Sequence, residues 1–313
     1  MVVGIVEKWP SLCDQVLIAE RLFGLSGSGK VTRWLAEQAG FVGDRDFART
    51  FSDHVDLPGI SSLDYAHRHI RTARGDLLGG IRFYSRDVRR PFVDVVAHSF
   101  DDLDDLAACV YAEWSPFSAR YLRLRTRPGR LADRRGVVLD KSIHAARCSD
   151  MAISDGRIGL ARFDTAQQAI DMVSDRYTQL AMTDPVLSRN LAPAAPEDLR
   201  DWHARHQLWA ITRDPDTVGV LAVAPGAIGW ITGQEINEEV ISVAHSGHRY
   251  ATSAQCAWAH GGFTEATDLL IGTIDRHNNR SRATAVRVGR PCVLDDVFIA
   301  LDHDARGNHG PAA

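Results

Sequence analysis

Lysine is nearly missing from this chain of 313 residues, in which it occurs only as Lys8, Lys30 and Lys141. A mechanism that needs a catalytic lysine therefore has three candidates, and arginine supplies most of the positive charge. A basic excess is missing as well, because 36 Lys and Arg residues stand against 40 Asp and Glu residues, for a net charge of -4. Dedicated nucleic-acid binders usually carry a basic excess, so the composition argues against that class.

Closely spaced cysteines are also missing, since the five in the chain lie at least 36 residues apart. This spacing excludes a zinc or redox motif of the CxxC type, and it predicts reduced thiols in a cytoplasmic protein. The sequence has no run of about 18 apolar residues, and its first ten residues lack the apolar core of a signal peptide, so we expect no membrane segment. The 45% hydrophobic and 24% charged residues are typical of a globular chain.

Helical and strand patterns alternate along the chain in two series of similar order. The first series predicts helices at 10–23 and 30–40 (the second capped by Ser28), strands at 67–73, 78–84 and 92–100, a helix at 101–114, and strands at 119–126 and 137–146. The second predicts a strand at 158–163, helices at 165–180 (capped by Thr165) and 197–206, strands at 208–212, 218–224 and 230–244, a helix at 251–260, a strand at 269–274, a helix at 281–289 and a strand at 293–301. We therefore predict an α/β fold of two domains, 1–152 and 153–313, each with a mixed, mostly antiparallel sheet flanked by helices.

Two motifs point to chemistry that the surrounding sequence does not support. Residues 24–30 fit the phosphate-loop pattern GxxxxGK, but Val31 replaces the Ser or Thr that holds magnesium. A helical pattern precedes this stretch instead of a buried strand, so we interpret it as a Gly/Ser connector between helices. His203 and His206 have helical spacing, but no third ligand is evident, and we expect no metal site.

The stretch from 235 to 301 carries the clearest functional signal. Residues 241–258 predict a strand, a tight turn with Gly247, and a helix, and Asn278-x-x-Ser281 opens a later helix that follows the strand GTID. Together with the preceding hairpin and helices, these elements resemble the GNAT superfamily of N-acetyltransferases over about residues 157–301. The resemblance implies that acetyl-CoA, or another acyl-CoA, lies in a split between two neighbouring parallel strands.

In that family the pyrophosphate of CoA rests on the free backbone N–H groups at the start of a helix, which form a natural anion site. The residues that the resemblance assigns to the cofactor are Ile241, Val243, His245, Ser246, Gly247, His248, Arg249, Tyr250, Ala251, Asn278 and Ser281. Arg249 stands where the family has a glycine, and we expect its guanidinium to donate hydrogen bonds to the phosphates. The alternative is a helix-capping turn whose polar residues face water.

Glutamates on the long strand are the candidates for the general base that removes a proton from the attacking amine. Glu239 and Glu235 are the two catalytic candidates, and strand alternation places them on one face with Glu238 on the other. Ala285 occupies the place of the family's tyrosine acid. The acid is therefore missing, or replaced by Ser281, His277 or Cys292.

These observations predict an acyltransferase that moves an acyl group, most simply acetyl, from acyl-CoA to an amine of a small molecule. The N-terminal half reads as a degraded copy of the fold, in which Asp101 and Asp102 repel phosphate at the corresponding turn, so we expect one cofactor site, in the C-terminal half. That leaves the N-terminal half to shape the acceptor pocket or support the fold. Two alternatives stay open: an aminoacyl transferase with aminoacyl-tRNA as donor, and a non-catalytic CoA-binding relic.

Overall fold

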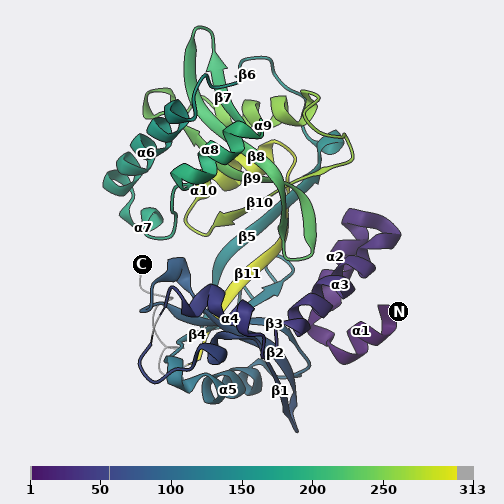
Figure 1. Ribbon diagram of the computed structural model, residues 1–313. Helices are drawn as coiled ribbons and strands as arrows, with labels where there is room; N and C mark the ends of the chain where they lie inside the picture. The colour runs from purple at the N-terminus through teal and green to yellow at the C-terminus, as the bar shows by residue number, and fades with distance from the viewer. Residues whose placement is uncertain (1, 56, 302–313) are drawn as a thin grey trace. The chain divides into compact units, whose positions relative to one another are not determined.

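The computed structural model describes residues 2–55 and 57–301, which form a mixed α/β fold (Figure 1). Within this part of the chain, eleven strands form one mixed sheet in the order β1-β2-β3-β4-β11-β5-β10-β9-β8-β7-β6. The strands are β1 (Arg68–Thr72), β2 (Gly75–Phe83), β3 (Pro91–His98), β4 (Tyr121–Thr126), β5 (Val137–Arg147), β6 (Gly159–Ala161), β7 (Leu208–Arg213), β8 (Asp216–Ile228), β9 (Ile231–Ile241), β10 (Leu269–Asp275) and β11 (Cys292–Ala300). The helices are α1 (Val2–Lys8), α2 (Cys13–Phe23), α3 (Gly27–Gly40), α4 (Arg45–Ser52), α5 (Leu103–Glu113), α6 (Ala166–Thr183), α7 (Pro185–Ser188), α8 (Pro196–Ala204), α9 (Tyr250–His260) and α10 (Asn279–Arg287).

The prediction of two separate sheets is wrong, because the last strands of the two series change places. Strand β11, which ends the second series, pairs antiparallel with β4 of the first series, from Asp295↔Thr126 to Ala300↔Tyr121. Strand β5, which ends the first series, lies between β11 and β10. Each series therefore completes its neighbour's part of the sheet, and the strands join into one.

The chain forms two compact units, which we treat one at a time. Unit 1 contains residues up to 141 and the segment from 294, and unit 2 contains residues 142–293. Because of the strand exchange, these bounds differ from the expected domains 1–152 and 153–313. The expected domain assignment stays a prediction.

Unit 1 has its core between the sheet and the helices α4 and α5. Leu77, Val93 and Leu122 of the strands are fully buried there against Leu106 and Val110 of α5. Helix α4 was not expected from the sequence, although Asp44 caps it by accepting hydrogen bonds from the backbone N–H groups of Asp46 and Phe47. The cap leaves two fewer unpaired amides at the start of this short helix.

Only the first part of the GxxxxGK stretch, residues 24–26, connects two helices as expected, because residues 27–30 already belong to α3. Residues Gly24–Ser26 form a 3₁₀ turn, and α3 starts at Gly27. A Cβ at Gly27 would collide with the backbone of Ala19, so glycine lets α2 and α3 pack closely at this point. The prediction that Ser28 caps this helix is wrong, because α3 begins at Gly27 and Ser28 lies inside it.

Unit 2 packs helices on both faces of the sheet. Val220 and Ala222 of β8 face Val173 of α6 and Leu199 of α8, whereas Leu221 and Val223 face the side that carries Ala254 and Trp258 of α9. Alternate residues of β8 thus serve two cores. The expected cap of α6 is confirmed, since Thr165 and Gln168 form a capping box.

Candidate functional site

The strands β9 and β10 of unit 2 form a parallel pair that is joined only near one end. The register contains Gln234↔Leu270 and Glu235↔Ile271, although β9 continues to Ile241 and β10 to Asp275. Gly233 permits a close approach at the joined end, since a Cβ there would meet the carbonyl oxygen of Leu269 at 2.5 Å. The paired register ends at Glu235↔Ile271, and we call the region between residues 236–241 and 272–275, where no further pair joins the two strands, the split.

A β-bulge changes the faces of the glutamates on β9. Ala222 of β8 lies opposite Glu238, but the next residue, Val223, lies opposite Ile236, so Asn237 is an extra residue. An extra residue reverses the alternation of side chains on the strand. The expectation that Glu235 and Glu239 share a face is therefore wrong. Relative to β8, Glu235 shares its face with Glu238, and Glu239 projects from the opposite face.

The contacts of the three glutamates agree with this assignment. Glu238 Oε1 accepts a hydrogen bond from the Tyr177 hydroxyl on α6 (3.3 Å), and its Oε2 accepts from the Ala194 N–H (2.9 Å). Glu239 Oε2 accepts from Gln255 Nε2 on α9 at 2.7 Å. Glu235 packs against β8, where a Cβ at Gly226 would lie 2.5 Å from its Oε2. Glu238 is thus engaged in structural hydrogen bonds, whereas Glu239 faces α9.

Glu239 has the protonation properties of a general base near neutral pH. Burial raises its pKa to about 7, even though the hydrogen bond from Gln255 and the positive charge of Arg290 act in the opposite direction. Its second oxygen, Oε1, is buried and has no hydrogen-bond partner in the described residues. A base with a pKa close to the working pH accepts a proton most effectively. Burial also raises the pKa of Glu235, which carries the second catalytic prediction.

The turn between β9 and α9 contains residues 242–249. Residues Val243–His245 form a 3₁₀ turn, and Gly247 (φ 86°) and Arg249 (φ 63°) have left-handed backbones. Ser253 N–H makes the first backbone hydrogen bond of α9, to the carbonyl oxygen of Arg249 (3.2 Å). In the described part of the chain, the N–H groups of residues 250–252 have no backbone acceptor, which leaves a free set of donors at the helix start.

Arg249 occupies a backbone conformation that glycine adopts with less strain. A left-handed conformation costs a residue with a Cβ about 1–2 kcal/mol. The side chain of Arg249 is exposed at the start of α9, next to the free N–H groups. The position therefore combines a left-handed backbone with an exposed cationic side chain.

Hydrogen bonds from a pair of charged residues outside the turn hold it in place. Arg157 Nη1 donates to the His248 carbonyl (3.1 Å), and its Nη2 donates to Ser253 Oγ (3.1 Å). Arg157 Nε also pairs with Asp155 Oδ2 (2.7 Å), which accepts a hydrogen bond from Ser253 Oγ (2.9 Å). The negative charge of Asp155 is thereby compensated by Arg157 before it can repel an anion at α9.

The remaining predicted site residues lie on or next to neighbouring elements. Asn278 is the cap of α10, and its Oδ1 accepts from the Ser281 N–H (3.1 Å). His277 Nε2 accepts from Arg276 Nε (2.8 Å), Cys292 is partly buried, and Ala285 is fully buried. The predicted cofactor residues Ile241, Val243, His245, Ser246, Gly247, His248, Arg249, Tyr250 and Ala251 form one continuous segment from the end of β9 to the first turn of α9. Their contacts with a cofactor stay predictions.

Metal chemistry has no visible basis in residues 2–55 and 57–301, where no three His, Cys, Asp or Glu residues gather to hold an ion. His203 Nε2 is hydrogen-bonded to the Phe163 carbonyl oxygen at 2.9 Å. In the same part of the chain, the structure contains no helix with the length and apolarity needed to cross a bilayer.

Two buried side chains at the split were not singled out in the sequence. Gln255 lies on α9 and is 2% exposed, and Arg290 follows α10 and is 3% exposed. Gln255 lies in a helix whose sequence pattern does not distinguish it from its neighbours. Arg290 lies in a loop between a glycine and a proline. Neither position has a spacing that signals proximity to Glu239, so no sequence pattern would have found them.

Unit 1 contains a second parallel pair, β3 and β4, joined at Phe92↔Tyr121, Val93↔Leu122 and Asp94↔Arg123. The helix that follows β3, α5, is capped by Asp102, whose Oδ1 accepts a hydrogen bond from the Asp104 N–H (2.7 Å). A carboxylate therefore already occupies the start of this helix, and the repulsion of phosphate there stays a prediction.

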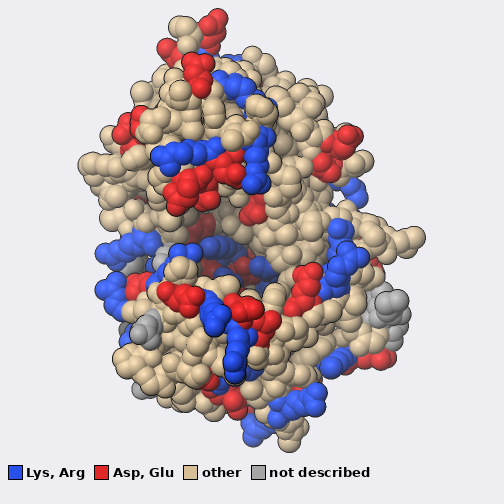
Figure 2. All heavy atoms as spheres, in the orientation of Figure 1, with Lys and Arg blue, Asp and Glu red and all other residues tan. Residues whose placement is uncertain are grey.

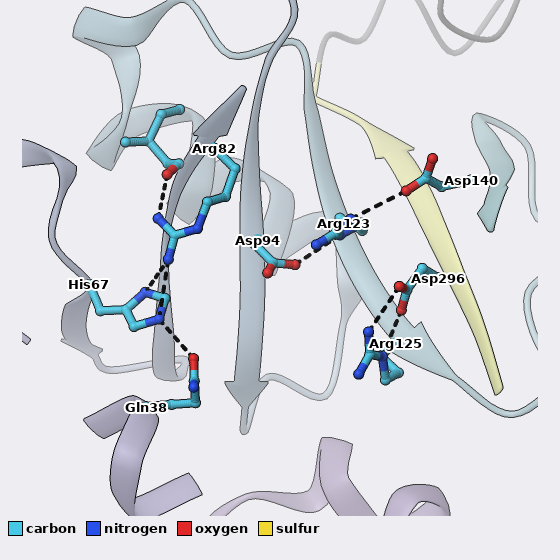
Figure 3. Close-up of polar contacts among 9 residues, drawn as sticks. Gln38, His67, Arg82, Asp94, Arg123, Arg125, Asp140 and Asp296 are labelled. Atoms are coloured by element: carbon cyan, nitrogen blue, oxygen red, sulfur yellow. Dashed lines mark hydrogen bonds and ion pairs between the residues drawn. The ribbon is translucent and has the colours of Figure 1, made fainter. Parts of the chain in front are cut away.

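Charged side chains at this pair in unit 1 contact one another (Figure 3). Arg123 Nε donates to Asp94 Oδ1 (3.0 Å) and its Nη1 to Asp140 Oδ2 (3.4 Å). Arg125 binds Asp296 through both carboxylate oxygens, at 2.7 and 3.0 Å. These pairs satisfy the buried charges within the unit itself.

Comparisons with known proteins give a distant structural similarity. No protein family and no curated protein matches the sequence. A GNAT-family acetyltransferase from Colwellia psychrerythraea is 9% identical, with 87% of this chain and 96% of that chain covered and a TM-score of 0.47. A Drosophila protein is 12% identical, with 96% of each chain covered and a TM-score of 0.45. A GCN5-related N-acetyltransferase from Sphaerobacter thermophilus is 10% identical, with 84% and 93% covered and a TM-score of 0.44.

Proposed function

We propose that this protein is an acyltransferase that moves an acyl group, most simply acetyl, from acyl-CoA to an amine of a small molecule. The observation that carries the proposal is the split between β9 and β10, next to which Glu239 has a partly buried side chain with a buried Oε1 and a pKa of about 7. Both the partly joined parallel pair and the base belong to unit 2, as does the helix start that follows β9. An acyl chain and a proton acceptor are thus brought to one place.

In the proposed reaction the amine nitrogen attacks the thioester carbonyl carbon. The N–C bond forms, the C–S bond breaks, the amine proton passes to Glu239, and the sulfur leaves as the CoA thiolate, which then takes up a proton. Positioning and proton transfer are the two contributions that this chain's residues make. The residue that protonates the thiolate stays open among Ser281, His277 and Cys292.

The start of α9 provides the proposed site for the CoA pyrophosphate. Its three free N–H groups and the positive end of the helix dipole favour an anion. The side chain of Arg249 adds an exposed cation at the same point, and Arg157 holds the turn in place through the His248 carbonyl. The described residues thus fit a CoA molecule at its anionic end and along the edge of β9.

The alternative donor, aminoacyl-tRNA, requires a surface that binds many phosphates. On the face of the molecule shown in Figure 2, Lys and Arg side chains are interleaved with Asp and Glu side chains. This mixture, together with the net charge of -4, favours acyl-CoA as the donor.

The first experiment measures CoA binding by calorimetry and by the melting temperature. A ligand that binds only the folded state raises the melting temperature by mass action, so CoA and acetyl-CoA should both do so. If CoA at ten times physiological concentration neither shifts the melting temperature nor gives heat, the acyltransferase proposal fails.

The second experiment compares Glu239→Gln with the matched control Glu235→Gln. With a panel of amines and acetyl-CoA, the Glu239 variant should lose turnover by roughly 10²-fold or more, because general-base catalysis contributes about that much. CoA affinity should stay unchanged. The Glu235 variant should retain turnover, since the bulge directs Glu235 to the opposite face. Full activity of Glu239→Gln would remove this residue from the mechanism.

A further inference from the structure

Three polar side chains gather between α9, the loop after α10, and the split: Gln255 and Arg290, which are buried, and Glu239, which is partly buried. One hydrogen bond joins the first two, from Gln255 Nε2 to Glu239 Oε2 (2.7 Å). In the described residues, Glu239 Oε1, Gln255 Oε1, and Arg290 Nε and Nη1 are buried without a hydrogen-bond partner. The cluster therefore combines unused acceptors and unused donors.

The guanidinium of Arg290 lies at the first step of the split. A Cβ added to Gly272 would be 3.2 Å from Arg290 Nη1 and 3.9 Å from Ile236 Cβ. Gly272 and Ile236 follow directly after Ile271 and Glu235, the last pair that joins β10 to β9. The glycine thus leaves room for the guanidinium at the point where the paired register ends.

Two hydrogen bonds hold the backbone of Arg290 in place. Its N–H donates to the Ala285 carbonyl (2.8 Å), and its carbonyl oxygen is hydrogen-bonded to His144 Nδ1 (2.9 Å). His144 is itself 1% exposed and contacts Ser142 Oγ through Nε2 (3.1 Å). This arrangement places a cation in the core of unit 2 although no acceptor in the described residues pairs with it.

A buried guanidinium without a partner is strongly disfavoured, because it loses its hydration and gains no hydrogen bonds. A ligand that supplies the partner removes this cost. A carboxylate fits best, because its two oxygens match the planar fork of the guanidinium. A doubly charged phosphate fits less well, since Glu239 adds negative charge to the same cluster.

We propose that Arg290 binds a carboxylate group of the substrate in the split, while Glu239 Oε1 and Gln255 Oε1 accept hydrogen bonds from the reacting amine. This inference rests on the proposed function for the role of the amine, and it narrows the substrates to those with a carboxylate close to the reacting groups. Two sources supply that chemistry: an amino acid as the acceptor, or a dicarboxylic acyl group on the donor. With a zwitterionic amino acid, the charges of Arg290 and Glu239 are both neutralised.

The experiment uses matched probes that differ only in the carboxylate. Calorimetry with the full chain, first without CoA, compares the twenty standard amino acids with their carboxamides, and a second series compares succinyl-CoA with acetyl-CoA. If the acceptor supplies the carboxylate, an amino acid should bind tenfold to a hundredfold more tightly than its carboxamide. If the acyl group supplies it, succinyl-CoA should bind more tightly than acetyl-CoA by the same factor. Equal affinities of acid and amide in both series, or no binding in either, would overturn the proposal.

Three variants test the role of Arg290 directly. Arg290→Met should remove the preference for the acid and leave the affinity for the amide unchanged. Arg290→Lys should retain part of the preference, because it keeps the charge but not the fork. Gly272→Ala should also weaken the preference, because its new Cβ crowds Nη1.

The stability of Arg290→Met separates a binding role from a structural one. If the unliganded protein holds an unpaired cation, an apolar side chain of similar volume should leave the melting temperature unchanged or raise it. A large fall in melting temperature would show that Arg290 is structural and would overturn the proposal. If CoA does not bind but acids still bind through Arg290, the proposed function fails while the carboxylate site stands.

Discussion

The strand pairs β3–β4 in unit 1 and β9–β10 in unit 2 are both parallel. They differ in whether the charged side chains beside them have hydrogen-bond partners. Beside the first pair, Arg123 and Arg125 contact Asp94, Asp140 and Asp296 (Figure 3). Beside the second pair, Arg290 and Glu239 attract each other electrostatically, but in the described residues no hydrogen bond or ion pair joins these two side chains. The comparison teaches that, beside a parallel strand pair, charged side chains can either pair with one another or stay without a partner, which a ligand could supply.

The helix starts differ in the same sense. Asp102 accepts a backbone hydrogen bond at the start of α5 and provides that helix with its own anion. At the start of α9 the N-cap position is held by Arg249, whose side chain makes no capping hydrogen bond. Unit 1 thus supplies its own partners for both features, whereas in unit 2 neither the helix start nor Arg290 has such a partner in the described residues.

The largest expected effect comes from breaking an internal pair in unit 1. Asp296→Ala leaves the buried Arg125 without its bidentate partner, and such a loss typically lowers the free energy of unfolding by about 3–5 kcal/mol. Urea unfolding of this variant, next to Arg290→Met of unit 2, measures the contrast. Similar losses in both variants would show that the two charge clusters serve the same structural purpose.

A smaller effect is expected at the start of α9. Hydrogen bonds to charged groups contribute about 1.5–3 kcal/mol, so Arg249→Ala should weaken CoA binding by roughly tenfold to a hundredfold. Dephospho-CoA, which retains the pyrophosphate, should lose affinity in the same way, whereas pantetheine should not. Unchanged CoA affinity in Arg249→Ala would leave the backbone amides as the whole site, or remove this turn from CoA binding.

The matched variant Arg249→Gly separates the side chain from the backbone. Glycine relieves the left-handed strain at this position and lets the backbone approach a phosphate more closely. It should therefore bind CoA more tightly than Arg249→Ala does. Equal affinities of the two variants would show that backbone strain has no part in binding.

The smallest expected effect is a pH dependence of opposite sign in the two units. Burial lowers the pKa of His67 and of His98 to about 4, so below pH 6.5 the unfolded chain takes up protons that folded unit 1 does not. The stability of unit 1 should fall as the pH is lowered from 6.5 towards 4. Burial raises the pKa of Glu239 to about 7, so unit 2 takes up this proton first and should gain stability as the pH is lowered from 7 to 4.5.

Hydrogen exchange of the strand amides, corrected for the intrinsic rates, resolves the two trends. Between pH 7 and pH 5 we expect opening free energies to fall by about 1–2 kcal/mol per histidine in β2 and β3, and to rise by a similar amount in β9. His67→Gln and Glu239→Gln should each flatten the trend in their own unit. The same sign of change in both strands would contradict the comparison.

Much of the local structure was predictable from the sequence. Apolar periodicity located most helices and strands to within a few residues, and the Thr165 cap and the turn before α9 were identified by residue type. The helices α1, α4 and α7 were missed, because each has at most eight residues and is too short to show a clear apolar period. Glu239 was a candidate by its place on the long strand, and its contact with Gln255 was not foreseeable.

The sequence by itself determined which segments fold as helices or strands, since periodicity, caps and turn residues act over a few neighbouring positions. Only the tertiary structure decided three other features: the exchange of β5 and β11, the bulge at Asn237, and the position of Arg290 at the split. Each depends on which distant segments pair, and the free energy of that choice is shared across the whole sheet. A single extra residue on β9 then reverses the faces of the glutamates, and no local pattern records it.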